Sequence, residues 1–243
     1  MVEAVPARRS PVVPVVVAVV AVLLAIVAFV ASRPQPQSSP AGAGPPSSGA
    51  QAATETGSGQ DPAAGLARRT PDDPMAVGKA DAPVVMVAYS EFQCPFCGTF
   101  ARDTEPGLVK KYVDTGVLRI EWRDFPYLGQ ESMTAALAGR AAAQQGDFWA
   151  FHDALYADQQ PVNAGKLTKE FLGDVAARAG LDGAQLKKDM ERPELTEAVS
   201  RDAREGQSIG VTGTPAFIIN GQPVIGAQPS EVFEKAIEDA TRR

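Results

Sequence analysis

The sequence predicts an α/β domain in which helices cover a single sheet and an all-helical segment is inserted in the middle. Three observations predict this class. Residues 83–90 (PVVMVAYS) are a continuous apolar run with β-branched members, which is typical of a buried central strand. Helical patterns then occupy about residues 128–210, and strand patterns return close to the C-terminus. The order strand, helix, strand, helices, hairpin and helix indicates one mixed α/β domain.

The other strands are predicted from alternation and from turn residues. Residues 117–125 (VLRIEWRDF) place Leu118, Ile120 and Trp122 on one face and charged side chains on the other. Residues 216–220 (AFIIN) lead into an Asn-Gly pair and the short run QPVIG, and Asn-Gly between apolar runs is a strong hairpin signal.

The helices are predicted from periodicity and from their end signals. A helical stretch is expected to follow the first strand as far as residue 116, with an interruption at Pro106. Asp147 and Asp182 are expected to cap two helices of the inserted segment. Ser230 is expected to cap the closing helix.

The N-terminal part is predicted to lie outside this domain. Residues 12–32 are uncharged and apolar, and they are long enough to cross roughly 30 Å of hydrocarbon, which predicts a retained transmembrane anchor. Residues 1–11 contain Arg8 and Arg9 and are expected to be a cytoplasmic tail. A cleaved signal peptide is the alternative, although the run is long for one. In either case residues 71–243 are expected to lie outside the cytoplasm.

Composition separates the domain from its anchor and limits its partners. Residues 33–70 are rich in Pro, Gly, Ser, Ala and Gln, with almost nothing apolar to bury, which predicts a disordered tether. The formal net charge of the chain is −6. Nucleic acid is not an expected partner, because its phosphates require a basic surface.

The sequence has two cysteines, Cys94 and Cys97, directly after the first strand. Cys94 opens a helix with Pro95 in its first turn, and the N–H groups of a helix N-terminus stabilise a thiolate. Cys97 lies one turn further on, so the pair is predicted to be catalytic and redox-active. The two alternatives are a metal site and a structural disulfide. A metal site would lack ligands, since His152 is the only histidine, and a structural disulfide would close only a short loop. We expect no metal and no cofactor besides the pair.

Three motifs together indicate a family. FQCPFC (92–97), QGDFWAFHDALY (145–156) and GTPAFIING (213–221) resemble the thioredoxin superfamily and its DsbA-like branch over residues 71–243. The resemblance implies a thioredoxin fold with an inserted helical subdomain. It also implies that Pro215 follows a cis peptide bond and faces the disulfide, and that the backbone of Thr214 pairs with an extended substrate peptide. The alternative for Pro215 is an ordinary strand-edge proline that marks the exit of a loop.

The resemblance implies thiol–disulfide exchange as the activity. We expect a monomeric, membrane-anchored oxidase that forms disulfides in exported proteins, which bind as extended peptides, and that is reoxidised by a membrane redox partner. A reductase or isomerase is one alternative, and a peptide-binding module with a structural disulfide is another.

Three nearby residues are predicted to modulate the pair. Pro95 sets the start of the helix. Phe96 stands where strongly oxidising relatives have a histidine, so one group that stabilises the thiolate is missing. Some relatives bury an acid where this chain has Ala88; Glu91 is predicted either to relay protons to Cys97 or to be a solvated loop carboxylate. His152 follows the helical spacing of apolar residues, so we expect it to pack against the core.

Overall fold

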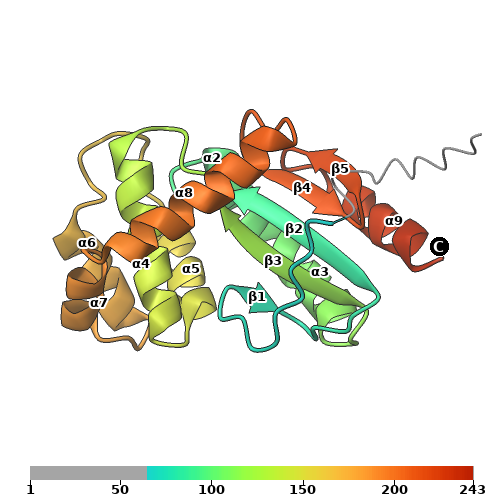
Figure 1. Cartoon of the computed structure of the whole chain (residues 1–243), viewed down its shortest axis with the longest axis horizontal. Helices are drawn as coiled ribbons and strands as arrows, with labels where there is room; N and C mark the ends of the chain where they lie inside the picture. The colour runs from blue at the N-terminus through green and yellow to red at the C-terminus, as the bar shows by residue number, and fades with distance from the viewer. Residues whose placement is uncertain (1–64, 243) are drawn as a thin grey trace, which may run out of the picture. The chain divides into compact units, whose positions relative to one another are not determined.

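The structure is a computed structural model that describes residues 65–242. A five-stranded sheet has the order β1-β3-β2-β4-β5, and helices gather at one end of it (Figure 1). Its strands are β1 (Ala76–Val77), β2 (Val84–Ser90), β3 (Leu118–Asp124), β4 (Ala216–Ile219) and β5 (Gln222–Ile225). The predicted α/β class, the thioredoxin fold and its helical insertion are therefore confirmed, and β1 is an additional strand that the sequence did not indicate.

The pairing of the strands places the cysteine motif and the Thr214-Pro215 motif at the same end of the central strands. β2 is parallel to β3 and antiparallel to β4, and Tyr89 near the end of β2 lies opposite Ala216 at the start of β4. The segment that follows β2 and the segment that precedes β4 consequently emerge side by side. The predicted hairpin is also present, because Asn220 and Gly221 both adopt positive φ between β4 and β5.

A long helical crossover joins β2 to β3. It consists of α2 (Pro95–Thr99), η1 (Phe100–Thr104), α3 (Glu105–Leu108) and η2 (Val109–Val113), where η1 and η2 are π-helical turns. The predicted interruption at Pro106 is wrong. Pro106 falls in the first turn of α3, after a wide turn in which the N–H of Glu105 binds the carbonyl of Phe100, so its missing donor breaks no bond.

The crossover and α9 (Ser230–Thr241) pack against one face of the sheet. Phe217 of β4 contacts Phe100 and Phe233, with ring centroids 4.4 and 4.9 Å apart, respectively. The predicted cap at Ser230 is wrong by one position: Pro229 is the extended N-cap residue, and Ser230 is the first residue inside α9. Proline fits there because its fixed φ already suits the extended N-cap conformation.

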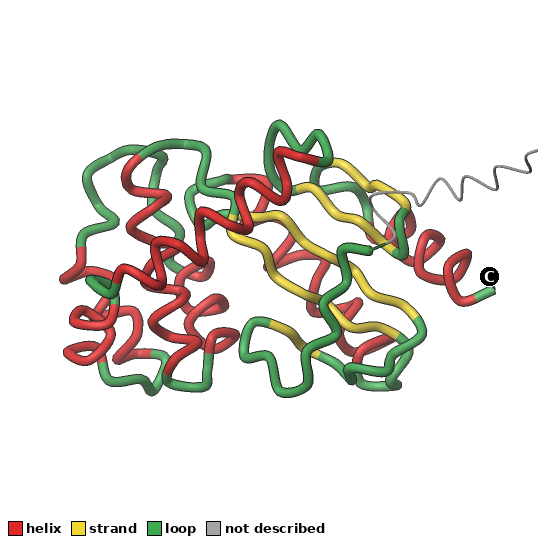
Figure 2. The backbone as a smooth tube through the Cα atoms, in the orientation of Figure 1, coloured by secondary structure: helices red, strands yellow, loops and turns green. Residues whose placement is uncertain are grey.

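The inserted segment is entirely helical between β3 and β4 and forms the red cluster at one end of the tube in Figure 2. Asp147 caps α5 by accepting from the N–H of Ala150, and Asp182 caps α7 by accepting from two N–H groups, so both predicted caps are confirmed. The five helices are α4 (Gln130–Gln144), α5 (Phe148–Ala157), α6 (Lys169–Arg178), α7 (Gly183–Asp189) and α8 (Pro193–Ser208).

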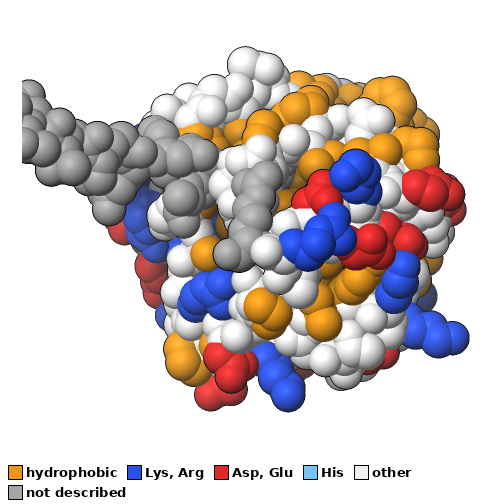
Figure 3. Space-filling view, turned by 90° about the vertical axis from the view of Figure 1, so that its right-hand side faces the viewer, with side chains coloured by type: hydrophobic (Ala, Val, Ile, Leu, Met, Phe, Trp, Pro, Cys, Tyr) orange, Lys and Arg blue, Asp and Glu red, His pale blue; other side chains and the backbone are white. Residues whose placement is uncertain are grey.

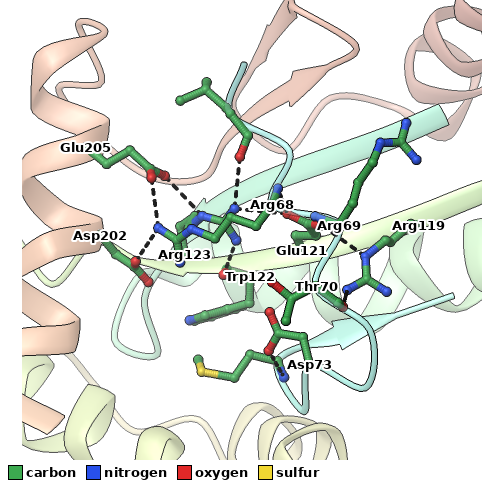
Figure 4. Close-up of polar contacts among 12 residues, drawn as sticks. Arg68, Arg69, Thr70, Asp73, Arg119, Glu121, Trp122, Arg123, Asp202 and Glu205 are labelled. Carbon is green, nitrogen blue, oxygen red and sulfur yellow. Dashed lines mark hydrogen bonds and ion pairs between the residues drawn. The ribbon is translucent and has the colours of Figure 1, made fainter. Parts of the chain in front are cut away.

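The charged face of β3 is buried. Arg119, Glu121 and Arg123 are all at most 3% exposed. Glu121 lies between the two arginines, at 2.9 Å from each guanidinium, and Arg123 also binds Glu205 of α8 (Figure 4). Burial opposes ionisation of Glu121, but hydrogen bonds from the backbone N–H of Arg68 and from both arginines outweigh it and lower its pKa to about 2.

This buried network also holds the segment that precedes the domain. Glu121 accepts from the backbone N–H groups of Arg68 and Arg69, and Arg119 donates to the carbonyl of Thr70 (Figure 4). Arg68 reaches Asp202 and Glu205 on α8. Residues 66–70, which the composition assigned to the tether, are thus bound along β3.

The surface of the domain mixes charges of both signs. Figure 3 shows the end that carries α9 and β5, where lysines, arginines and acidic residues alternate with apolar side chains. Within residues 65–242 no helix combines the length and the apolar character that a membrane span needs. The predicted anchor over residues 12–32 lies outside the described residues.

Removing the central charge of the buried network is expected to destabilise the domain. Glu121→Gln leaves Arg119 and Arg123 buried without their shared counter-ion, and breaking such a pair costs about 3–5 kcal/mol. The free energy of unfolding in urea measures the loss. Lys235→Gln, which removes an exposed ion pair with Asp239, is the matched control and should leave the midpoint unchanged. A loss for Glu121→Gln as small as for the control would contradict a structural role of the network.

Candidate active site

The two cysteines lie at the N-terminus of α2, directly beyond the end of β2. Cys94 is the N-cap residue with extended backbone angles, and Pro95 occupies the first turn. Both thiols are free and both residues are 1% exposed. The structure therefore holds the pair in its dithiol form, with Cys94 where the unpaired N–H groups of the helix point.

The loop before β4 faces Cys94. The Thr214–Pro215 peptide bond is cis, and the Cys94 thiol donates to the carbonyl of Thr214 at 3.2 Å. The structure thus brings the pair Cys94 and Cys97 together with the pair Thr214 and Pro215, although more than a hundred residues separate the two pairs in the sequence. The buried Thr214 hydroxyl has no hydrogen-bond partner within the described part of the chain, so it is free to donate to a thiolate.

The two thiols differ strongly in acidity. Hydrogen bonding from the Cys97 thiol, from the Thr214 side chain and from N–H groups at the start of α2 lowers the pKa of Cys94 to about 6, in opposition to burial. Burial raises the pKa of the Cys97 thiol well above its usual range, and the neighbouring Cys94 raises it further. Cys94 is therefore the candidate nucleophile of the pair, and the raised pKa of Cys97 favours its protonated form.

The modulating residues occupy different environments. Phe96 is 66% exposed next to the pair. Glu91 is only 2% exposed, so the alternative of a solvated loop carboxylate is wrong. The loop packs inward because the hydroxyl of Tyr156 donates to the Glu91 carbonyl. Burial raises the pKa of Glu91 to about 7, and the negative charge of Cys94 contributes to that increase.

The helical insertion positions the loop that carries the cysteines. The Gln159 amide donates to the carbonyls of Phe92 and Cys94 at 3.0 and 2.9 Å. Gly98 permits this approach, because a side chain there would overlap Gln159. Gln93 is bound by Ser132 and Asn163. The role of Gln159 was not predicted from the sequence, because no local pattern indicates which residues of the insertion contact the loop.

Two tyrosines lie near the site but were not among the predicted site residues. Tyr127 is 47% exposed, and its hydroxyl lies near Gly213 and Thr214. Tyr156, by contrast, is 1% exposed and accepts or donates at 3.3 Å to Ser90. His152 is buried with its Nδ1 atom 2.8 Å from Asp153, so the expected packing role is confirmed.

A cysteine at a helix N-terminus, a second cysteine one turn below it and a facing cis-proline loop define a thiol–disulfide exchange site. The family model described as Thioredoxin matches residues 70–239. The chain therefore belongs to the thioredoxin family and, within it, to the DsbA-like thiol–disulfide oxidoreductases.

The relatives agree with this assignment. The probable disulfide bond formation protein D of Bacillus anthracis is 33% identical over 172 residues, which are 69% of this chain and 78% of the relative. The crystal structure of oxidised BdbD from Bacillus subtilis is 26% identical with a TM-score of 0.65, covering 71% of this chain and 94% of that one. A thioredoxin-like oxidoreductase from Silicibacter pomeroyi is 30% identical with a TM-score of 0.62, covering 76% and 98%.

The hydroxyl of Thr214 should contribute to the acidity of Cys94. Thr214→Val keeps the shape of the side chain but removes a donor to the thiolate, so the pKa of Cys94 is expected to rise from about 6. The ultraviolet absorbance of the thiolate, followed against pH in the reduced protein, measures it. Thr115→Val at an exposed position is the control. An unchanged titration curve in Thr214→Val would show that the hydroxyl does not act on Cys94.

Proposed function

We propose that this chain is an extracytoplasmic dithiol oxidase that introduces disulfides into exported proteins through the Cys94–Cys97 pair. The observation that carries the proposal is the unequal acidity of the two thiols. A stabilised Cys94 thiolate favours the reduced form of the pair, and a pair whose reduced form is favoured is a stronger oxidant. The similarity to disulfide bond formation proteins supports the same direction.

The reaction proceeds by two exchanges. A substrate thiolate attacks the Cys94 sulfur of the oxidised pair, the Cys94–Cys97 bond breaks, and Cys97 leaves and takes up a proton. A second substrate thiolate then attacks the substrate sulfur of this mixed disulfide, and Cys94 leaves as a thiolate. The substrate loses two electrons, which the pair gains. A membrane redox partner takes these electrons from the pair and restores the disulfide.

Substrates are proposed to bind as extended peptides along the backbone of Thr214 before β4. The exposed rings of Phe96 and Tyr127 offer apolar contacts to such a peptide. Residues 12–32 are proposed to anchor the chain in the membrane, and the remaining tether to let a monomeric domain reach its substrates. The alternative of an inert structural disulfide does not apply to a thiol–disulfide oxidoreductase.

Trapping experiments test the exchange. Cys97→Ser is expected to accumulate mixed disulfides when the reduced full chain meets a protein that contains a disulfide, because the Cys94 thiolate attacks that disulfide and no Cys97 thiol is present to release the product. Cys94→Ser, the matched control, should trap none and should lose oxidase activity. Equal trapping by the two variants would contradict the assignment of Cys94 as the sulfur that bonds to the substrate.

The reduction potential tests the direction. A lowered pKa of Cys94 predicts a potential clearly above roughly −270 mV, the value typical of a reductant of the thioredoxin type. Equilibration of the full chain with glutathione mixtures measures it. A potential at or below that value would overturn the oxidase and favour the reductase alternative.

Phe96 is expected to limit the oxidising strength. Phe96→His places an imidazole on the exposed side of the pair, and a protonated imidazole there would further lower the pKa of Cys94 and raise the potential. Phe96→Leu, which adds no charge, is the control. The same glutathione equilibration measures both variants, and an unchanged potential in Phe96→His would show that this position does not act on the thiolate.

A further inference from the structure

A small cavity adjoins Cys97 in the interior of the domain. Its volume is about 10 Å³, which is about what one water molecule requires. Its lining is polar in part, as a bound water needs, and includes the side chains of Cys97, Ser90, Glu105, Trp149, His152 and Tyr156. Trp149, which lines the cavity, has a buried Nε1 donor without a hydrogen-bond partner among residues 65–242.

Glu105 connects this cavity with the surface. It lies at the start of α3 and is only 7% exposed. It also lines a surface pocket of about 670 Å³ together with Arg102, Lys110 and Asp114. One carboxyl group therefore lies between the interior space next to Cys97 and an opening to solvent.

The exchange reaction requires such a group. Cys97 must gain a proton when the disulfide opens and must lose it when a mixed disulfide is resolved, yet its burial keeps solvent away. β2 provides no acid beneath the pair, because Ala88 occupies that position of the strand. Glu91 does not line the cavity, and the charge that acts on it is that of Cys94.

We propose that Glu105 exchanges the proton of Cys97 with solvent, through a single water molecule in the cavity between them. This inference deepens the proposed function and rests on the same exchange reaction, in whichever direction it runs. It assigns Glu105 to the thiol of Cys97 as its proton donor and acceptor, separate from Glu91, whose pKa is influenced by Cys94.

The proton balance is simple. When a substrate thiolate attacks Cys94, the Cys94–Cys97 bond breaks and the electron pair goes to the Cys97 sulfur. The water gives a proton to that sulfur and receives one from the Glu105 carboxyl. The products are the mixed disulfide, the Cys97 thiol and the Glu105 carboxylate, which regains a proton through the surface pocket. In the reverse step the carboxylate takes the proton of Cys97 through the same water. The Cys97 thiolate then attacks the Cys94 sulfur of the mixed disulfide, the bond between Cys94 and the substrate breaks, and the substrate leaves as a thiolate.

The acidity of Glu105 allows it both to donate a proton toward Cys97 and to accept one from it. Burial raises its pKa to about 7; the electrostatic interaction with His152, whose Nε2 lies 3.7 Å away, opposes this increase, and that with Asp153 adds to it. Its protonated and ionised forms are thus both populated near neutral pH. The titratable and charged groups around it come from the crossover and from α5: Cys97, Arg102, Lys110, Asp114, His152, Asp153 and Tyr156.

The test follows the opening of the disulfide by reduced glutathione in the oxidised full chain. Trp122 and Trp149, the only two tryptophans, both line the cavity, so intrinsic fluorescence in a stopped-flow instrument reports the step. The rate is divided by the glutathione thiolate concentration to remove the ionisation of the attacking group. Glu105→Gln is compared with Glu105→Asp, Glu91→Gln and Asp114→Asn, an exposed residue of the same surface pocket.

In the wild type the corrected rate should fall as pH rises through about 7, because protonated Glu105 is the donor. Glu105→Gln should be slower by about 100-fold or more below that pH, should lose the inflection, and should match the wild type at high pH. Glu105→Asp, Glu91→Gln and Asp114→Asn should keep the inflection. Loss of the inflection in Glu91→Gln instead, or its persistence in a folded Glu105→Gln, would overturn the proposal.

Failure of the proposed function would look different. A wild-type pair that glutathione does not open at any pH would contradict the exchange activity itself. A wild-type pair that opens readily, with a corrected rate independent of pH, would contradict only the role of Glu105.

Discussion

The contact between the Cys94 sulfur and the loop before β4 is the constraint on which the rest of the site depends. It exists because β2 and β4 are antiparallel with Tyr89 opposite Ala216, so the end of one strand meets the beginning of the other. The same junction starts α2, whose N–H groups face the sulfur. Strand register, helix start and loop conformation therefore combine to make one buried thiol acidic while its neighbour, one turn further in, is not.

Local signals made much of this predictable from sequence. The apolar run of β2, the alternation of β3, the Asn-Gly hairpin and the caps at Asp147 and Asp182 each depend on a few consecutive residues, and each is present. The position of the cysteine pair at a helix N-terminus was also predictable, because the pair follows directly on a strand and includes a proline in the first turn of the helix. The cis bond before Pro215 and the facing position of Thr214 came from resemblance alone, since nothing local specifies them.

What the sequence did not indicate depends on pairing between distant segments. β1 has two residues and exists only because β3 offers an unpaired edge. The charged face of β3 alternates like a solvated one, yet α8 and residues 66–70 cover it and supply its counter-ions. Gln159 reaches the Cys94 carbonyl from a helical insertion whose own pattern shows only helices and caps. In each of these cases the structural role of a residue depends on which distant segments it contacts, and the residue type alone does not indicate it.

The insertion is consequently part of the redox site. Its α5 supplies His152, Trp149 and Tyr156 to the cavity beside Cys97, and the loop after α5 supplies the glutamine that binds the backbone of Cys94. Enclosing Cys97 in this way separates the acidities of the two thiols, which the proposed role of Cys94 as the sole nucleophile requires. The same enclosure cuts Cys97 off from solvent protons, although every turnover moves a proton on or off its sulfur. A site that gains selectivity by burying one thiol must therefore also bury an acid near it, and Glu105 is the acid that borders the space in which Cys97 lies.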